Sequence, residues 1–357
     1  MKKYRSMILI AIFALLISIS GCLNTNSEKL QGNVPGNKMA LEREGVLYFV
    51  SPDMHTDSYA IYRQAGDDVP VKILTGSLLP DRGIGISGDF LYYIKDYPYT
   101  LYRINVANQS AKEEKIIENA SSFSLYDHRL FYWNPQDKFI YTLDISEGFP
   151  KPQALNQVEP LFLMEAYKDE VLYITGDFKQ ATDGNNYSQQ LWRMNDKGES
   201  QLLLETSHLD QCRPYQDYIY YLSNKEIWRI DANGENQMKI YSPDDDASVR
   251  YFIVYKDRIY ILEQAPGLYY FRSVNLAGKE RQTIYNYRPP EKDFNGVIEY
   301  LKLITFNVTE KHLFLDGYSF FSGAHLITRI PIAGEADQKF EEVLLNGHWI
   351  NSEVYVQ

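Results

Sequence analysis

The chain has 357 residues, 45% hydrophobic and 23% charged, a composition typical of a folded globular protein and not of a disordered one. Its 36 Lys and Arg against 47 Asp and Glu leave a net charge of −11, which disfavours nucleic acid as a partner because nothing would draw a polyanion to it. The 30 Tyr, 17 Phe and 4 Trp favour strands, where large flat side chains pack on a pleated face, and predict an all-β protein.

The first segment, residues 1–22, reads MKKYRSMILIAIFALLISISGC. Lys2, Lys3 and Arg5 precede an apolar run over 7–17, which is shorter than the roughly 20 apolar residues that a transmembrane helix needs. Positive charges, a short apolar run and small residues at its end are typical of an export signal, so we predict a signal peptide over residues 1–21. An uncleaved signal anchor is the alternative.

The end of this segment, ISGC (19–22), resembles the lipobox of bacterial lipoproteins, in which an aliphatic residue and two small residues precede an obligatory cysteine. The resemblance implies cleavage before Cys22 and a diacylglycerol on its sulfur. Two acyl chains make a stable anchor because each buried methylene contributes about 0.8 kcal/mol. The expected location is therefore the extracytoplasmic side of the cell membrane, with the membrane as a partner through Cys22.

Residues 22–44 are expected to be the lipidated cysteine and a flexible tether, because LNTNSEKLQGNVPGNKMA (23–40) is polar, contains Gly and Pro, and has no hydrophobic period. Without residues 1–21 the chain keeps 33 Lys and Arg against 47 Asp and Glu, a net charge of −14. Anionic lipid headgroups would repel such a body, so we expect the folded domain, residues 45–357, to stand off the membrane.

Internal repetition dominates the rest of the chain. The stretch YIYYLSNKEIWRIDANGEN (218–236) joins two aromatic strand patterns through a polar gap and ends in a glycine turn. The same unit recurs seven times, and its first strands are marked by Leu47, Leu91, Leu130, Leu172, Ile219, Ile259 and Leu313. A spacing of roughly 40 to 50 residues is the size of a four-stranded propeller blade.

Each unit has room for four strands, for example with EEKIIE (113–118) and SFSLYD (122–127) between two recognisable hairpins. Turn glycines recur at Gly198, Gly234, Gly278 and Gly334, where a tight hairpin requires a positive φ. We therefore predict a β-propeller of seven blades, with six or eight as alternatives. The final segment, GHWINSEVYVQ (347–357), is expected to pair with the first blade and close the ring.

The motifs IYTLD (140–144) and IWRID (227–231) carry a resemblance to the bacterial prolow-density-lipoprotein-receptor-related-protein-like β-propeller domain of unknown function, and more distantly to YWTD and TolB-type propellers. The resemblance covers about residues 45–357 and implies a scaffold, since this fold serves many functions. A recurrent arginine in the second hairpin strand suits packing better than one active site, and we interpret it as structural. It stands at Arg63, Arg103, Arg193, Arg229 and Arg329.

Long connections on one face of a propeller are where function tends to concentrate. They are expected at 51–59, 176–190, 285–300 and 316–325, and they carry aromatic and basic side chains of the kind found at the centres of protein interfaces. The candidate binding residues are Tyr59, Phe178, Tyr187, Tyr285, Tyr287, Arg288, Tyr318, Phe320, Phe321 and His325. These aromatics could instead pack their own loops.

Signatures of catalysis are missing from the sequence: it contains no HExxH, GxSxG or P-loop motif, and its histidines show no ligand spacing. We therefore expect no cofactor and no metal, with Cys212 as a small packing residue and SPDDDAS (242–248) as a solvated turn. The favoured function is binding of an envelope protein or a glycan. The alternative is an envelope glycan lyase or hydrolase with carboxylates or histidines gathered at the channel mouth.

Overall fold

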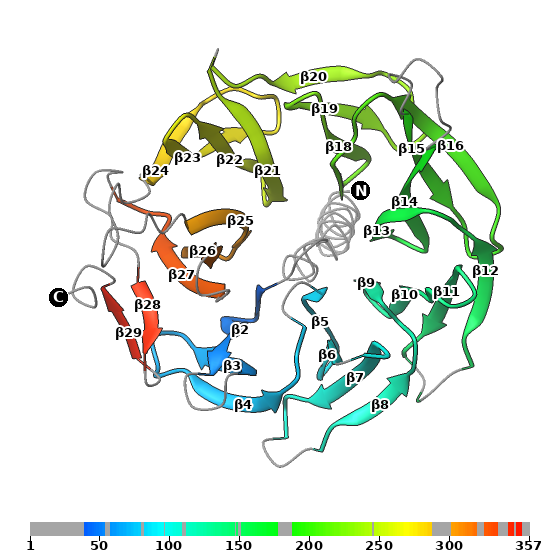
Figure 1. Cartoon of the computed structure of the whole chain (residues 1–357), viewed down its shortest axis with the longest axis horizontal. Helices are drawn as coiled ribbons and strands as arrows, with labels where there is room; N and C mark the ends of the chain where they lie inside the picture. Colours follow the sequence, from blue (N-terminus) through cyan, green and yellow to red (C-terminus); the bar gives the residue numbers. More distant parts are fainter. Residues whose placement is uncertain are drawn as a thin grey trace, which may run out of the picture.

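The computed structural model describes residues 39–53, 58–79, 82–95, 97–108, 112–146, 148, 151–177, 188–244, 246–287, 301–319, 325–334, 342–345 and 348–351. In these residues the fold is a seven-bladed β-propeller, as the repeats predict, with seven antiparallel sheets arranged around a central axis (Figure 1). Six sheets have four strands, and the seventh has a fifth strand at its outer edge.

Within each blade the strands follow the chain from the axis outward. The innermost strands are β1 (Ala40–Arg43), β5 (Ile84–Ser87), β9 (Ser122–Tyr126), β13 (Leu161–Tyr167), β17 (Gln211–Tyr215), β21 (Ser248–Tyr255) and β25 (Leu301–Val308). The second strands are β2 (Val46–Asp53), β6 (Phe90–Lys95), β10 (Arg129–Trp133), β14 (Glu170–Asp177), β18 (Tyr218–Ser223), β22 (Arg258–Ala265) and β26 (His312–Ser319).

The outer half of each blade has the same order. The third strands are β3 (Ser58–Ala65), β7 (Thr100–Asn105), β11 (Phe139–Asp144), β15 (Ser188–Met194), β19 (Glu226–Asp231), β23 (Leu268–Asn275) and β27 (His325–Pro331). The outer strands are β4 (Val71–Gly76), β8 (Glu114–Ile117), β12 (Gln153–Gln157), β16 (Ser200–Thr206), β20 (Met238–Tyr241), β24 (Gln282–Tyr287) and β28 (Glu342–Leu345), followed by β29 (His348–Asn351).

The core is divided among the junctions between neighbouring blades. Alternation along each strand sends one set of side chains toward each adjacent sheet, so a separate apolar cluster fills each of the seven junctions. The cluster between blades 7 and 1 contains the buried residues Met39, Ala40, Phe49, Ala60, Tyr62 and Phe314. No blade buries both of its faces alone, so each blade is stabilised by its two neighbours.

The prediction that segment 347–357 pairs with the first blade is wrong for its described part. Strand β29 instead pairs with β28, with Leu345 opposite His348, and extends the outer edge of blade 7 (Figure 1). Blade 1 has its own inner strand, β1, which pairs with β2 from Ala40↔Phe49 to Arg43↔Val46. This strand lies inside the segment expected to be a tether, because ALER (40–43) is short and has no aromatic pattern to mark it.

Polar side chains join successive inner strands near the axis. Asn307 Oδ1 on β25 accepts hydrogen bonds from the backbone N–H groups of Met39 (2.7 Å) and Ala40 (3.3 Å), and so links blade 7 to blade 1. Ser124 accepts from the Ala166 N–H at 2.9 Å, and Gln211 from the Phe252 N–H at 3.2 Å. These bonds satisfy backbone donors that the inner edge of a blade leaves without a strand partner.

Candidate functional site

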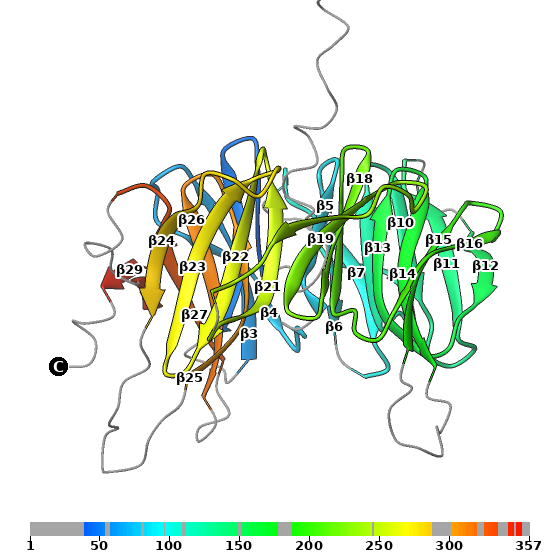
Figure 2. The same cartoon turned by 90° about the horizontal axis from the view of Figure 1, so that it is seen from above.

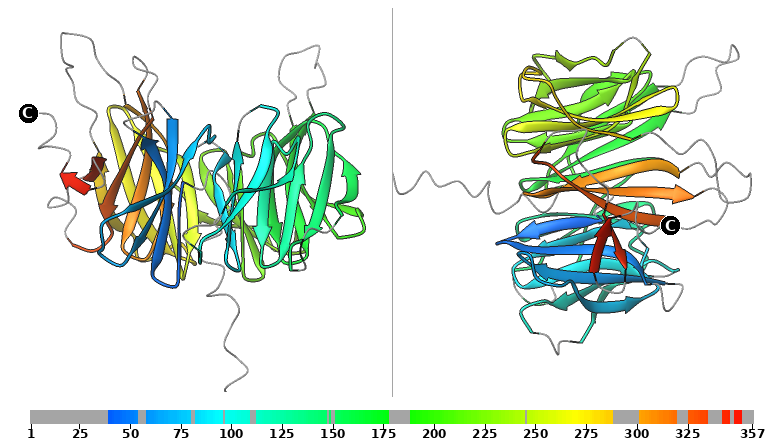
Figure 3. Two further views of the ribbon diagram at one scale, coloured as in Figure 1. Left: turned by 90° about the horizontal axis from the view of Figure 1, so that it is seen from below. Right: turned by 90° about the vertical axis from the view of Figure 1, so that its left-hand side faces the viewer.

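The two faces of the ring carry different connections (Figures 2 and 3). The hairpins between second and third strands and the links between successive blades lie on one face, which we call the loop face. The other two hairpins of each blade lie on the opposite face, which we call the turn face. The expected long connections 176–190, 285–300 and 316–325 belong to the loop face, although much of each is outside the described residues.

Of the ten candidate binding residues, three have described side chains, and all three lie on strands where loops were expected. Tyr59 is on β3 and packs against the cluster between blades 1 and 2. Tyr285 and Tyr287 are on β24, half-buried against the cluster between blades 6 and 7. Their ring centroids lie 6.3 Å from Phe271 and 6.1 Å from Tyr269, respectively. These tyrosines therefore contribute to packing.

The remaining candidates are only partly covered. Tyr318 on β26 and His325 on β27 are paired across the end of their hairpin, at the loop face. Phe178, Tyr187, Arg288, Phe320 and Phe321 lie outside the described residues. Their role in binding stays a prediction.

A different aromatic group stands on the loop face in blade 2, at the hairpin between β6 and β7. Tyr97 is 84% exposed, and its ring meets Tyr99 edge-on with 5.6 Å between centroids. The guanidinium carbon of Arg82, on the link from blade 1, lies 5.3 Å from the centre of the Tyr99 ring. We call Arg82, Tyr97 and Tyr99 the aromatic tip. It combines the residue types that dominate binding energy at protein interfaces.

Backbone hydrogen bonds hold the aromatic tip in place. The N–H groups of Asn119 and Ala120, on the link to blade 3, donate to the carbonyls of Pro98 (3.2 Å) and Tyr99 (2.8 Å). Tyr99 has φ of 50° and stands immediately before the third strand, where other blades use Lys138, Lys225 or Gly267. A bulky residue in this conformation costs about 1–2 kcal/mol, and such strain gathers at functional positions.

The sequence signal for the aromatic tip is the motif YPY (97–99), between the strand patterns DFLYYI and TLYRINVAN. Two aromatics flank a proline in a connection of the expected loop face. A search for long connections misses this motif, because the connection that contains it is short. A large aromatic at the tip of a tight hairpin has no core to enter, and exposure follows from that position.

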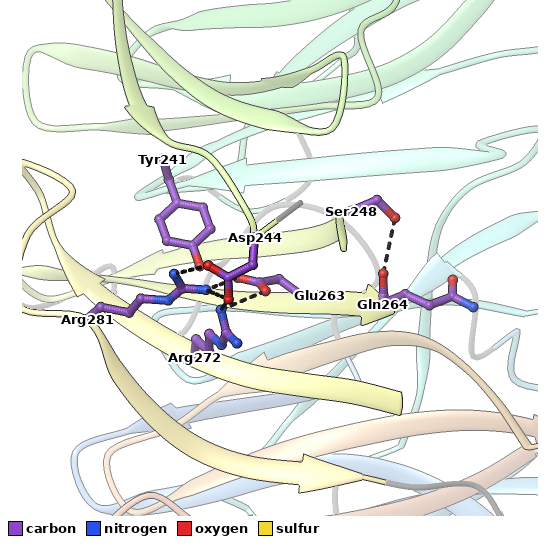
Figure 4. A network of polar contacts seen from close by, with 7 residues as sticks. All are labelled: Tyr241, Asp244, Ser248, Glu263, Gln264, Arg272 and Arg281. Carbon is purple, nitrogen blue, oxygen red and sulfur yellow. Dashed lines mark hydrogen bonds and ion pairs between the residues drawn. The ribbon is translucent and has the colours of Figure 1, made fainter. Parts of the chain in front are cut away.

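A network of polar side chains, several of them buried, joins blades 5 and 6 (Figure 4). Glu263 on β22 is fully buried, accepts a hydrogen bond from Tyr241 and pairs with Arg272 at 3.0 Å. Asp244 accepts from Arg272 at 3.0 Å and from both terminal nitrogens of Arg281 at 2.8 and 3.0 Å. The described part of segment 242–248 is largely exposed, as expected for a solvated turn, but Asp244, whose side chain is 65% exposed, also binds two arginines of blade 6.

Burial raises the pKa of Glu263, while Tyr241 and Arg272 act in the opposite direction. Tyr241, Arg272 and Arg281 lie around its carboxylate in Figure 4. The side chain is 0% exposed, so no part of it is open to a substrate. We interpret this network as a joint between blades. Removing one partner of such a buried ion pair destabilises the protein, because the other charge is left buried without a counter-charge.

A second buried network connects the inner strands of blades 4, 5 and 6. Arg213 on β17 donates to Glu165 on β13 and to the Tyr251 hydroxyl on β21, each at 2.9 Å. Glu165 and Arg213 are 0% and 2% exposed. The neighbouring Cys212 is fully buried, as expected for a packing residue, and burial raises the pKa of its thiol, which keeps the thiol protonated and unreactive.

The recurrent arginines make contacts within and between blades, which supports their structural interpretation. Arg103 and Arg329 pair with outer-strand carboxylates, Glu114 at 2.8 Å and Glu342 at 2.6 Å. Arg193 donates to the carbonyl of Ala232 in the next blade at 2.8 Å.

Within the described residues, no group of three or more His, Cys, Asp or Glu side chains could hold a metal ion. The described part also has no helix long and apolar enough to cross a membrane.

Comparisons with known proteins identify the fold. No protein-family model matches the sequence, and no curated protein matches it. Among solved structures, a prolyl endopeptidase is similar over 89% of this chain, with a TM-score of 0.60 and 12% identity. This chain spans about half (52%) of that enzyme.

Two further solved structures match over most of both chains. An oligogalacturonate lyase solved with manganese has a TM-score of 0.54 at 12% identity, over 85% of this chain and 87% of the lyase. The propeller domain of the trilobed protease from Pyrococcus furiosus has a TM-score of 0.57 at 10% identity, over 83% and 95%. At such identities the likeness concerns the fold alone: the chain is a seven-bladed β-propeller, built like the propellers of these enzymes.

Proposed function

We propose that this protein is a lipid-anchored, extracytoplasmic binding module whose loop face recognises another protein of the cell envelope. The aromatic tip carries the proposal, because Tyr97 presents a large apolar ring to solvent on a hairpin that backbone bonds hold rigid. A rigid exposed aromatic loses little conformational entropy on binding. The lipobox at Cys22 supports the location.

The aromatic tip lies on the loop face, where the sequence predicts further exposed aromatics in the connections of other blades. Patches of exposed apolar side chains mark binding sites when they gather on one surface. Two carboxylates deep in the ring, Glu165 and Glu263, are engaged by arginines. This favours binding over the alternative of an envelope lyase or hydrolase, which needs an acid and a base open to substrate.

The test is in-cell crosslinking and pull-down of the anchored protein beside Tyr97→Ser. Tyr218→Ser is the matched control: Tyr218 is 37% exposed, with the Arg229 guanidinium carbon 4.1 Å from its ring centre, and it lies on the turn face. We expect a specific partner that Tyr97→Ser loses and Tyr218→Ser keeps. A further variant, with Tyr318, Phe320 and Phe321 changed to Ser, asks whether the partner spans the loop face.

The proposal would be overturned if the Tyr97→Ser variant still captured the partner, or if both single variants lost it equally. If no protein is captured, oligosaccharide binding to the purified protein distinguishes a glycan-binding module. Turnover of those oligosaccharides would establish the enzyme alternative.

A further inference from the structure

The turn face is hollowed at the junction of blades 7 and 1. A pocket of about 540 Å³ opens there, within the size range of small-molecule sites. Both blades contribute to its walls, and most of the lining residues are polar or charged, among them Glu42, Asp67, Glu310, Lys311, His312 and Arg329. The pocket is on the opposite side of the ring from the aromatic tip.

A close contact that is made at three other junctions is absent at this one. A turn glycine of blades 4, 5 and 6 packs so closely on the outer strand of the preceding blade that an added Cβ would lie under 3.0 Å from a carbonyl oxygen. In blade 1, Gly45 and Gly66 line the pocket, and a Cβ at either would have nothing within 4 Å. Among the described residues, the seam between blades 7 and 1 is thus open at these two glycines.

The charges around the pocket are nearly, but not fully, balanced. Three cations each pair with one of its carboxylates: Lys311 with Asp67 at 3.3 Å, Arg329 with Glu342 at 2.6 Å, and Lys256 with Glu310 at 2.9 Å. The fourth carboxylate is Glu42, whose Oε2 accepts the Glu310 backbone N–H at 2.8 Å. Within the part of the chain that the structure describes, no cation forms an ion pair with Glu42.

A neutral imidazole stands in the same pocket. Burial and the nearby Arg329 lower the pKa of His312 to about 4, so at neutral pH the ring adds a hydrogen-bond acceptor without adding positive charge. A primary ammonium, which has three donors and no acceptor, matches a pocket that offers both a carboxylate and such a ring. An anion would instead face four carboxylates and compete for cations that are already paired.

We propose that the seam pocket binds a small organic molecule that carries a primary ammonium group, and that Glu42 receives the ammonium. An ammonium fits better than a metal ion, since no metal-ligating group of side chains gathers among the described residues. The remaining volume would hold the body of the ligand against Leu47 and Pro331, the apolar parts of the wall. This site is independent of the loop face and of its proposed partner.

The test uses matched probes on the purified protein. Glucosamine and 1,4-diaminobutane carry ammonium groups, and glucose and 1,4-butanediol are their neutral counterparts. Isothermal titration calorimetry should detect an ammonium probe and not its counterpart. Glu42→Gln should lower the affinity for that probe about tenfold or more, because a charge-assisted hydrogen bond is lost. Glu44→Gln, at a side chain 81% exposed and outside the pocket, is the control and should bind as the unaltered protein does.

A second measurement does not depend on how a variant folds. Carbodiimide activation of the unaltered protein with glucosamine present should form the amide at Glu42 faster than at Glu44, as read by tandem mass spectrometry. Neutral and ammonium probes binding alike, binding unchanged in Glu42→Gln, or equal labelling of the two glutamates would each overturn the proposal.

Discussion

Turn glycines set how closely successive blades approach. Gly198, Gly234 and Gly278 have φ of 82°, 87° and 76°, a region that residues with a Cβ rarely adopt. Each also packs against a carbonyl of the preceding blade, at Leu155, Leu203 and Ile240 respectively. The positive φ could be predicted from the sequence, since a hairpin turn is local. The packing could not, because its partner lies 31 to 43 residues earlier in the chain.

Gly278→Ala tests this double role. The substitution adds left-handed strain of about 1–2 kcal/mol and a clash with Ile240 that costs about 1–3 kcal/mol more. Gly267→Ala is the control, since Gly267 has φ of 69° but open space around it. We expect the melting temperature to fall further for Gly278→Ala than for Gly267→Ala. Equal melting temperatures would show that the close approach contributes nothing.

His312 predicts a dependence of stability on pH. Its pKa is lowered from 6.5 to about 4, so as pH falls through this window the unfolded chain binds a proton that the folded protein does not. The free energy of unfolding should therefore fall between pH 6.5 and 4. Since the ring is partly exposed, we expect a loss of about 1–2 kcal/mol. Urea unfolding at pH 7 and pH 5 should show a smaller loss for His312→Gln; an identical loss would contradict the assignment.

At the scale of elements, strands and their pairing follow local patterns, whereas ion pairs between blades do not. The predicted segments 113–118 and 122–127 are confirmed as β8 and β9. By contrast, Glu165 and Arg213 lie 48 residues apart on different blades, and neither stands in a motif. Alternation along a strand determines which side chains face a neighbouring sheet, but not which polar groups meet there.

Glu165→Gln should strongly destabilise the ring, because it leaves the Arg213 guanidinium buried without a counter-charge, a cost of about 3–5 kcal/mol. The double variant Glu165→Leu with Arg213→Met removes both charges and should recover most of that loss. Chemical unfolding of the three proteins provides the measurement. A double variant no more stable than Glu165→Gln would mean that the pair itself stabilises the inner strands.

The two terminal strands should differ in importance. A chain that stops at Leu345 loses β29, which pairs only at the outer edge of blade 7, and its melting temperature should fall by a few degrees at most. A chain that starts at Gly45 loses β1 and the bonds from Met39 and Ala40 to Asn307, and should melt about 10 °C lower or more. If the chain that stops at Leu345 melted lower than the chain that starts at Gly45, the prediction that the C-terminal segment closes the ring would be supported after all.

At the scale of the whole molecule, a ring of similar blades carries features that belong to particular blades. The aromatic tip is on blade 2, the Glu165–Arg213–Tyr251 network spans blades 4 to 6, and the pocket is at the seam. Repetition supplies the frame, and departures from it supply candidate sites. If Cys22 anchors this ring to a membrane, its net negative body would stand off anionic lipids.

Cys22→Ser should release the protein from the membrane fraction and abolish incorporation of labelled palmitate, because the sulfur that would carry the diacylglycerol is gone. Cys212→Ser is the matched control: its thiol is buried, so this variant should remain anchored and labelled. Cell fractionation and metabolic labelling give both readouts. Membrane association that persists without label in Cys22→Ser would favour the uncleaved signal anchor.

The sequence by itself determined the all-β class, the seven repeats, most strand positions and the conformation of the turn glycines, since alternation and turn chemistry act between near neighbours. Tertiary structure decided the rest. The role of β1, the position of β29, the packing of Tyr285 and Tyr287, the binding of Asp244 by two arginines and the open seam all depend on contacts between blades. Such contacts join residues tens to hundreds of positions apart, and no local pattern records which residues will meet.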